Sequence, residues 1–232
     1  MIKAVFFDLY QTLVHYRPTQ AELEAEALNS LGFKTPAAAL ELPILTANEV
    51  LYTEMAGRPL SKRSREEIAA LYTEYQRTVL KEAGIKAEEK VVLKLLAMMQ
   101  QAHMDLVVYD DALPVLTDLK KRGLVTGLIS NIEKNMNETI EKLGIASKLD
   151  IIVTSLDAGA AKPQPEIFQY ALKKGCVQPS ESIYVGDQYQ VDMAGAKAAG
   201  MQGILIDRVG YYRQKLDCPK IKSLKEIIQY VV

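Results

Sequence analysis

The stretch "VFFDLYQTLV", residues 5–14, decides how the rest of the chain is interpreted. It continues a mostly apolar run that begins at Ile2, and this run predicts a buried strand, because strands covered on both faces are apolar throughout rather than alternating. Asp8 then places a carboxylate at the end of the strand. A buried charge is costly unless it is paired, so the fold has to bring a partner to Asp8.

Composition narrows the class of protein. The 232 residues are 49% hydrophobic, enough for one large domain or for a core domain with an insert. With 28 basic and 29 acidic residues, nothing suggests a nucleic-acid partner. We see no membrane span and no signal peptide, and the two cysteines form no disulfide framework or metal motif. We therefore expect a cytoplasmic protein with a small-molecule substrate.

From about residue 106 onward, short apolar runs alternate with helical patterns. The expected strands are 123–130, 149–155, 182–187 and 203–208, and the expected helices are 110–123, 133–144, 165–175, 192–200 and 223–232. Such alternation predicts an α/β fold with a parallel sheet and right-handed crossovers. The strand at 2–8 should join the same sheet.

Residues 16 to 104 have a different pattern, with about four helices and no convincing strand. We therefore expect a core made of residues 1–15 and 105–232, interrupted by a helical module at 16–104. A loop in this module, residues 57–65, carries four basic side chains, namely Arg58, Lys62, Arg63 and Arg65. They form either a solvated loop or a patch that faces an anionic substrate.

Polar residues follow the predicted strands where ligands of parallel sheets bind, beyond the carboxyl ends. They are Asp8, Tyr10 and Thr12 after the first strand, Ser130 and Asn131 after the second, Lys162 in the loop after the third, and Asp187 and Asp192 after the fourth. Asp8 and Asp187 would repel each other unless a cation lay between them, and Mg²⁺ accepts such carboxylates together with phosphate oxygens. Asp8 could then attack phosphorus, while Lys162 and Ser130 hold the phosphoryl oxygens.

Four ordered motifs resemble those of the haloacid dehalogenase (HAD) superfamily of hydrolases. They are "FFDLYQTL", "LISN", "AKPQPEIF" and "VGDQYQVDMAGAKAAG". The resemblance implies a Rossmann-like, doubly wound core, and it identifies the helical insert as a C1-type cap that closes over the site and selects the substrate.

The resemblance also implies residue roles. Asp8 would be the nucleophile and a Mg²⁺ ligand, and Tyr10 would bind the ion through its backbone carbonyl. Asp187 would also hold the Mg²⁺ ion, with Asp192 as the further member of this acidic metal site. The phosphoryl group would be bound by Ser130 and Lys162. Asn131, which follows Ser130 in the motif, would belong to the same site, and Thr12 would support it.

Two departures from the family pattern leave alternatives open. Phosphatases of the family usually carry a second Asp where this chain has Tyr10, and a Gly where it has Gln11. Tyr at this position is typical of metal-independent 2-haloacid dehalogenases, but that branch usually lacks the acid that corresponds to Asp187. The interpretations are therefore a Mg²⁺-dependent phosphatase of a small metabolite, which we favour, a 2-haloacid dehalogenase, or a degenerate member that only binds a ligand or partner.

Overall fold

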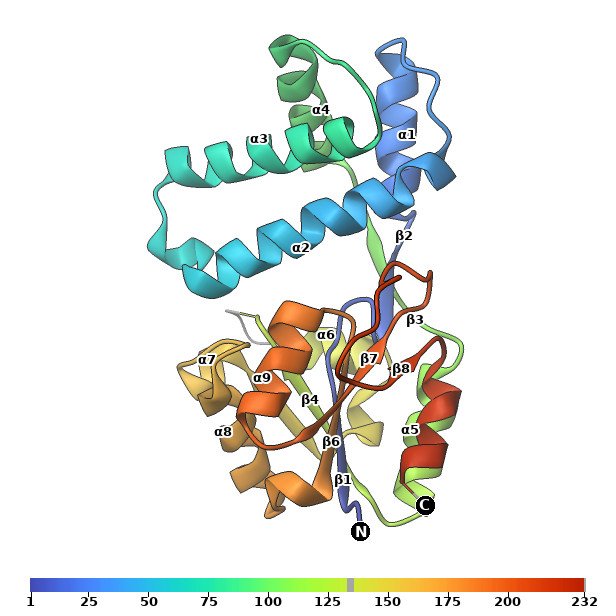
Figure 1. Ribbon diagram of the computed structural model, residues 1–232, viewed down its shortest axis with the longest axis vertical. Helices are drawn as coiled ribbons and strands as arrows, with labels where there is room; N and C mark the ends of the chain where they lie inside the picture. The colour runs from blue at the N-terminus through green and yellow to red at the C-terminus, as the bar shows by residue number, and fades with distance from the viewer. Residues whose placement is uncertain (133–135, 232) are drawn as a thin grey trace. The chain divides into compact units, whose positions relative to one another are not determined.

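The computed structural model describes residues 1–132 and 136–231, and the chain forms two compact units (Figure 1). The core unit comprises Met1–His15 and Leu106–Val232, and the insert unit comprises Tyr16–Asp105. Two short strands where the chain passes between the units, β2 (Val14–Arg17) and β3 (Asp105–Val108), pair with each other. The sequence pattern did not predict this pair, because β2 reads VHYR and does not form an apolar run.

The core unit contains a six-stranded parallel sheet in the order β5-β4-β1-β6-β7-β8. The strands are β1 (Ala4–Phe7), β4 (Val125–Ser130), β5 (Ile151–Thr154), β6 (Ser182–Gly186), β7 (Gln202–Ile206) and β8 (Lys220–Ile221). The predicted parallel α/β sheet is thus confirmed. The two-residue strand β8 was not predicted, because so short a segment has no detectable periodicity.

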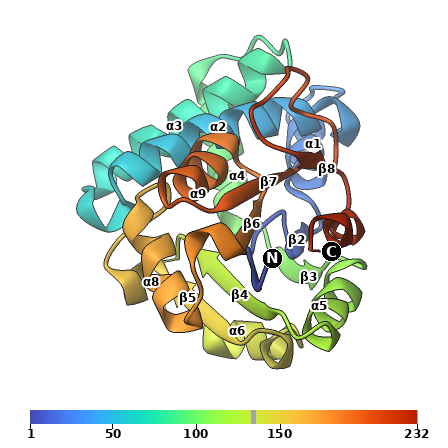
Figure 2. The ribbon, with the colours of Figure 1, turned by 60° about the horizontal axis from the view of Figure 1, so that its bottom comes forward.

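Helices cover both faces of this sheet, and Figures 1 and 2 show α5 and α8 on opposite sides of the strands. The first face is covered by α5 (Ala112–Lys121), α6 (Asn137–Lys142) and the 3₁₀ segment Leu224–Tyr230. The second face is covered by α8 (Pro165–Gly175) and α9 (Ala194–Ala198). A short helix, α7 (Ser155–Ala158), follows β5. Val5 and Phe7 pack in one hydrophobic cluster, and Ala4 and Phe6 in the other. This two-sided burial explains why the first strand is apolar throughout.

Three predicted helices of the core unit differ in detail. Residues 133–135 of the predicted helix 133–144 lie outside the described residues. The first two residues of the predicted helix 192–200 belong to a π-helical turn, Tyr189–Met193, and α9 runs only from Ala194 to Ala198. The C-terminal helix is 3₁₀ rather than α, and its first turn is tied to another element, because the Leu224 amide donates to Asp111 Oδ2 at 2.9 Å.

The insert unit contains the helices α1 (Gln20–Ser30), α2 (Glu41–Gly57), α3 (Arg65–Glu82) and α4 (Glu89–Gln101). Thr19 and Ser64 begin α1 and α3 with capping boxes, which satisfy the first amides of each helix. Residues such as Leu28, Val79 and Leu95 form the hydrophobic core of the unit. Over the described part of the chain, none of the helices combines the length and the apolar character that a membrane span requires.

Candidate active site

The site residues lie at the carboxyl edge of the sheet because three neighbouring strands end there. Asp8 follows β1, Ser130 is the last residue of β4, and Asp187 follows β6. The register pairs Phe7 with Leu128 on one side and with Val185 on the other. Strands adjacent in this order bring together side chains that are more than 100 positions apart in the sequence.

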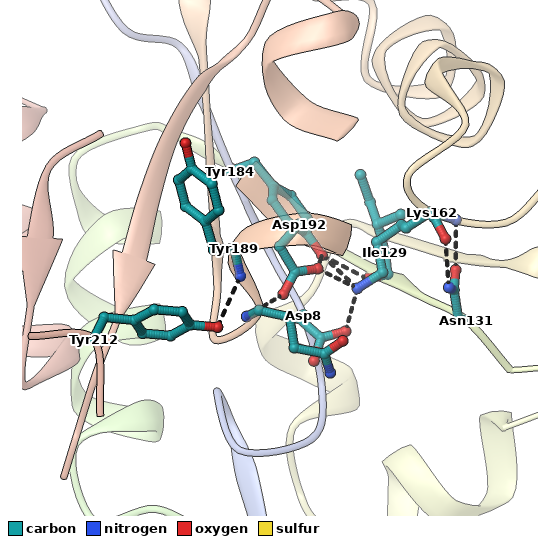
Figure 3. A network of polar contacts seen from close by, with 9 residues as sticks. Asp8, Ile129, Asn131, Lys162, Tyr184, Tyr189, Asp192 and Tyr212 are labelled. Atoms are coloured by element: carbon teal, nitrogen blue, oxygen red, sulfur yellow. Dashed lines mark hydrogen bonds and ion pairs between the residues drawn. The ribbon is translucent and has the colours of Figure 1, made fainter. Parts of the chain in front are cut away.

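Lys162 is the partner of Asp8. Its ammonium nitrogen lies 2.5 Å from Asp8 Oδ1, 2.7 Å from Asp192 Oδ1 and 2.8 Å from the Tyr184 hydroxyl (Figure 3). The Lys162 side chain is only 3% exposed, and these acceptors satisfy its three N–H donors. The buried carboxylate that ends the first strand is therefore compensated by a lysine 154 positions away.

Asn131 holds the backbone of Lys162 in place. Its amide nitrogen donates to the Lys162 carbonyl at 2.8 Å, and its Oδ1 accepts from the Lys162 N–H at 2.6 Å. Because both polar ends of Asn131 are used in this way, its role in the structure is to fix the loop that presents Lys162. Ser130, beside it, is 2% exposed and lies at the end of β4.

Asp192 and Asp187 have different surroundings. Asp192 Oδ1 binds Lys162 and lies 3.2 Å from the Tyr184 hydroxyl, and its Oδ2 accepts from the Gln188 N–H at 3.0 Å. The close approach of Asp192 to β6 requires glycine at position 186, where a Cβ would lie 2.3 Å from Asp192 Oδ2. By contrast, the buried Oδ1 of Asp187 has no hydrogen-bond partner among the residues that the structure describes.

The electrostatics of the cluster favour a cation. Asp8, Asp187 and Asp192 each offer an oxygen within 4.8 Å of the others. Burial, opposed by Lys162 and reinforced by Asp192, raises the pKa of Asp8 to about 6. Burial and the other two carboxylates raise the pKa of Asp187 well above its ordinary value. Three carboxylates and one ammonium leave an excess of negative charge, and Asp187 has an unused buried oxygen, so the cluster could hold a metal ion.

The loop after Asp8 makes a tight turn. Gln11 lies in the left-handed region with φ 57°, and its N–H donates to the Val14 carbonyl at 2.7 Å. Thr12 is fully buried, and its Oγ1 has no hydrogen-bond partner among the described residues. Tyr10 is half-buried and forms an isolated bridge with Val14.

Sequence reasoning missed two residues of this region. Tyr184 belongs to the strand "SIYVG" and is fully buried, and its hydroxyl lies 3.1 Å from the Ile129 carbonyl as well as close to Lys162. A buried tyrosine hydroxyl usually has a partner, so a tyrosine inside an otherwise apolar strand was the available signal. Arg208, which follows β7, donates to the Thr12 carbonyl at 2.9 Å, and no local pattern marks it.

Comparison with known proteins agrees with this geometry. A family model described as haloacid dehalogenase-like hydrolase matches residues 2–200. Mouse haloacid dehalogenase-like hydrolase domain-containing protein 3 is 35% identical over 99 residues, 43% of this chain and 39% of that protein, so the match spans about two fifths of that relative. Glyceraldehyde 3-phosphate phosphatase of Methanopyrus kandleri is 30% identical over 91% of this chain and 86% of its own length.

Among solved structures, the 2-haloacid dehalogenase from Pseudomonas syringae pv. Tomato DC3000 is similar to this chain with a TM-score of 0.57. The two are 25% identical, and the match covers 99% of this chain and 97% of the dehalogenase. The family model and the phosphatase relative, which matches 91% of this chain, agree with the fold and with the ordered motifs. The chain belongs to the haloacid dehalogenase-like hydrolases.

Proposed function

We propose that this hydrolase is a Mg²⁺-dependent phosphatase that acts on a small phosphorylated metabolite through an aspartyl-phosphate on Asp8. The observation that carries this proposal is the buried Oδ1 of Asp187, which lies beside Asp8 and has no hydrogen-bond partner among the described residues. An additional carboxylate next to the nucleophile is unfavourable in a metal-free enzyme, because the two negative charges repel each other. In a metal-dependent enzyme the same carboxylate serves as a ligand of the cation. Similarity to a phosphatase over 91% of this chain supports the same substrate class.

The proposed reaction has two chemical steps. An oxygen of Asp8 forms a bond to phosphorus while the bond to the leaving oxygen breaks; the leaving oxygen keeps that electron pair and takes a proton from solvent, because position 10 carries no carboxylic acid. Water then attacks the phosphorus and gives up a proton to solvent, the bond between phosphorus and Asp8 breaks, and inorganic phosphate is released. Lys162, held by Asp192 and Tyr184, neutralises charge on the phosphoryl oxygens, and the Ser130 hydroxyl donates a hydrogen bond to them.

Asp8, Asp187 and the Tyr10 carbonyl would hold the Mg²⁺ ion, with Asp192 completing the acidic cluster and Thr12 supporting the loop. The bound ion supplies positive charge that offsets the charge of the transferring phosphoryl group. Asp192 already accepts hydrogen bonds with both oxygens, so its principal role in this proposal is to orient Lys162.

A 2-haloacid dehalogenase is the second candidate function. Tyr10 in the first motif favours it, as does the structural similarity to the Pseudomonas syringae enzyme. In this reaction Asp8 would attack carbon and expel halide, and the resulting ester would be hydrolysed. Asp187 argues against it, because a second carboxylate beside Asp8 would repel a carboxylate substrate.

The insert unit, Tyr16–Asp105, is proposed to act as a C1-type cap that selects the substrate. Two of the four basic residues of its loop are already bound within the unit. Arg58 pairs with Glu67 at 2.5 Å, and Arg63 donates to the Arg58 and Glu54 carbonyls. A patch that faces the substrate would therefore depend on Lys62 and Arg65.

A panel of phosphate monoesters and 2-haloacids, assayed with Mg²⁺ and with a chelator, tests the proposal. The wild type should release phosphate only with Mg²⁺, and Asp8→Asn should retain less than about a hundredth of that rate. Halide release that persists in the chelator, without phosphatase activity, would instead establish the dehalogenase.

A further inference from the structure

Gln11 takes a backbone conformation that glycine usually occupies. Its φ is 57°, and Cys176, with φ 53°, is the only other non-glycine residue in the described ranges with a positive φ. A non-glycine residue persists in this region only where its surroundings determine it. Gln11 lies in the loop that joins Asp8 to Val14, so whatever fixes Gln11 also fixes the loop that carries Asp8.

Tyr109 is the residue that reaches Gln11. Its hydroxyl donates to Gln11 Oε1 at 3.0 Å, and its backbone N–H donates to the Leu13 carbonyl at 3.0 Å. The Tyr109 ring stacks on the His15 ring with centroids 4.5 Å apart. The loop is therefore bound by both the side chain and the backbone of one residue at the end of β3.

Arg208 supports Tyr109 and binds the loop at a second point. Its guanidinium lies 3.7 Å from the centre of the Tyr109 ring and donates to the Thr12 carbonyl at 2.9 Å. Asp111 accepts from the same guanidinium at 2.9 and 3.0 Å, and it also accepts from the Ser223 hydroxyl. This bidentate pair is mostly buried, with 17% of the Arg208 side chain exposed, so the guanidinium has one well-defined position.

We propose that Tyr109 and Arg208 are positioning residues that hold the Asp8–Val14 loop in the conformation in which Asp8 can react. In this chain their contacts stabilise a turn that a glycine at position 11 would adopt without help. The inference rests on the proposed role of Asp8 as the reacting group. It has a specific consequence. Removing the Tyr109 hydroxyl should lower turnover while residue 11 is glutamine, and should leave turnover unchanged when residue 11 is glycine.

The test is a double-mutant cycle of Tyr109→Phe and Gln11→Gly, with kcat and KM measured for 4-nitrophenyl phosphate and Mg²⁺. With Gln11 present, Tyr109→Phe should lower kcat about tenfold and change KM less than about twofold. The loss of kcat should be smaller than the roughly 100-fold that a 1 Å misplacement of the reacting groups can cause. In the Gln11→Gly background the same change should leave kcat within about twofold. Tyr170→Phe, which removes the hydroxyl of a surface tyrosine, is the matched control.

Arg208→Lys tests the second contact. Lysine keeps the charge beside Asp111 but lacks the planar fork that binds Asp111 and Thr12 together, so kcat should fall while KM stays within about twofold. A Tyr109→Phe effect of equal size with glutamine and with glycine at position 11, or wild-type kcat in Arg208→Lys, would overturn the proposal.

Hydrogen exchange separates this inference from the proposed function. The amides of Gln11, Leu13 and Val14 are hydrogen-bonded inside the loop, and Tyr109→Phe should speed their exchange only while residue 11 is glutamine. If the wild type hydrolysed no phosphate ester, the proposed function would fail while this measurement still tested the loop contacts. Unchanged exchange in Tyr109→Phe would refute the positioning role.

Discussion

Glu24 gives the sharpest quantitative prediction, because it is a carboxyl group inside the hydrophobic core of the insert unit. It is 0% exposed, its Oε1 accepts from Gln20 Nε2 at 2.9 Å, and its Oε2 has no partner among the residues described. The Oε1 of Gln76, also buried, is likewise unpartnered within the described chain. Burial raises the pKa of Glu24 from 4.5 to about 7, although hydrogen bonds from Gln20 and Gln76 oppose this.

The raised pKa makes stability depend on pH in a definite direction. The folded protein keeps the Glu24 proton up to about pH 7, whereas the unfolded chain releases it near 4.5. The free energy of unfolding therefore falls as pH rises between these values, by about 1.4 kcal/mol per pH unit and roughly 3 kcal/mol in all. Tyr75, the neighbouring titratable group, has a pKa raised well above its ordinary value by burial, Glu24 and Tyr52, so it stays neutral throughout.

Glu24→Gln should remove this dependence. The amide carries no charge at any pH, and it keeps an oxygen that can accept the hydrogen bonds from Gln20 and Gln76. The variant should have nearly wild-type stability near pH 4.5 and should be more stable than the wild type by roughly 3 kcal/mol near pH 8.

Urea unfolding followed by far-UV circular dichroism at several pH values measures the difference, since the chain has no tryptophan for fluorescence. Hydrogen exchange in α1 and α3 assigns the change to the insert unit. Glu26→Gln, an exposed position on the same helix, should reproduce the wild-type pH dependence. If wild type and Glu24→Gln differed by the same free energy at every pH, the reasoning about the buried carboxyl would be wrong.

Three further predictions concern the core unit. Asp187→Asn should weaken Mg²⁺ binding by more than about 100-fold, because losing a direct ligand costs more affinity than the roughly 10- to 100-fold lost with a residue that only contacts a ligand. Unchanged Mg²⁺ affinity by calorimetry would exclude Asp187 as a ligand. Tyr10→Asp should raise the turnover of alkyl phosphates about tenfold, because the new carboxyl group would supply part of the roughly 10²- to 10⁴-fold rate increase that a general acid–base typically contributes. An unchanged ratio of the alkyl phosphate rate to the nitrophenyl phosphate rate would contradict this. Tyr184→Phe should lower stability by about 1–3 kcal/mol, because Lys162 loses a buried acceptor; a thermal midpoint equal to wild type would refute that account.

The sequence by itself determined the elements and their class. Continuous apolar runs such as residues 2–7 predicted strands buried on both faces, and the alternation after residue 106 predicted a parallel sheet. The helical periodicity of residues 16–104 predicted about four helices, and the structure has α1, α2, α3 and α4 there. These inferences succeeded because burial periodicity acts over a few residues.

The contacts that define the site were decided by tertiary structure alone. The sequence placed Asp8 and Lys162 at one edge of the sheet. Only the fold shows that Asp192 and Tyr184 share the Lys162 ammonium, and that Asp187 Oδ1 has no partner within the described parts of the chain. Likewise, the sequence around Gln11 does not predict its hydrogen bond with Tyr109, which lies 98 positions away. Partners and desolvation of buried polar groups depend on which distant segments meet, and a local pattern carries no information about that meeting.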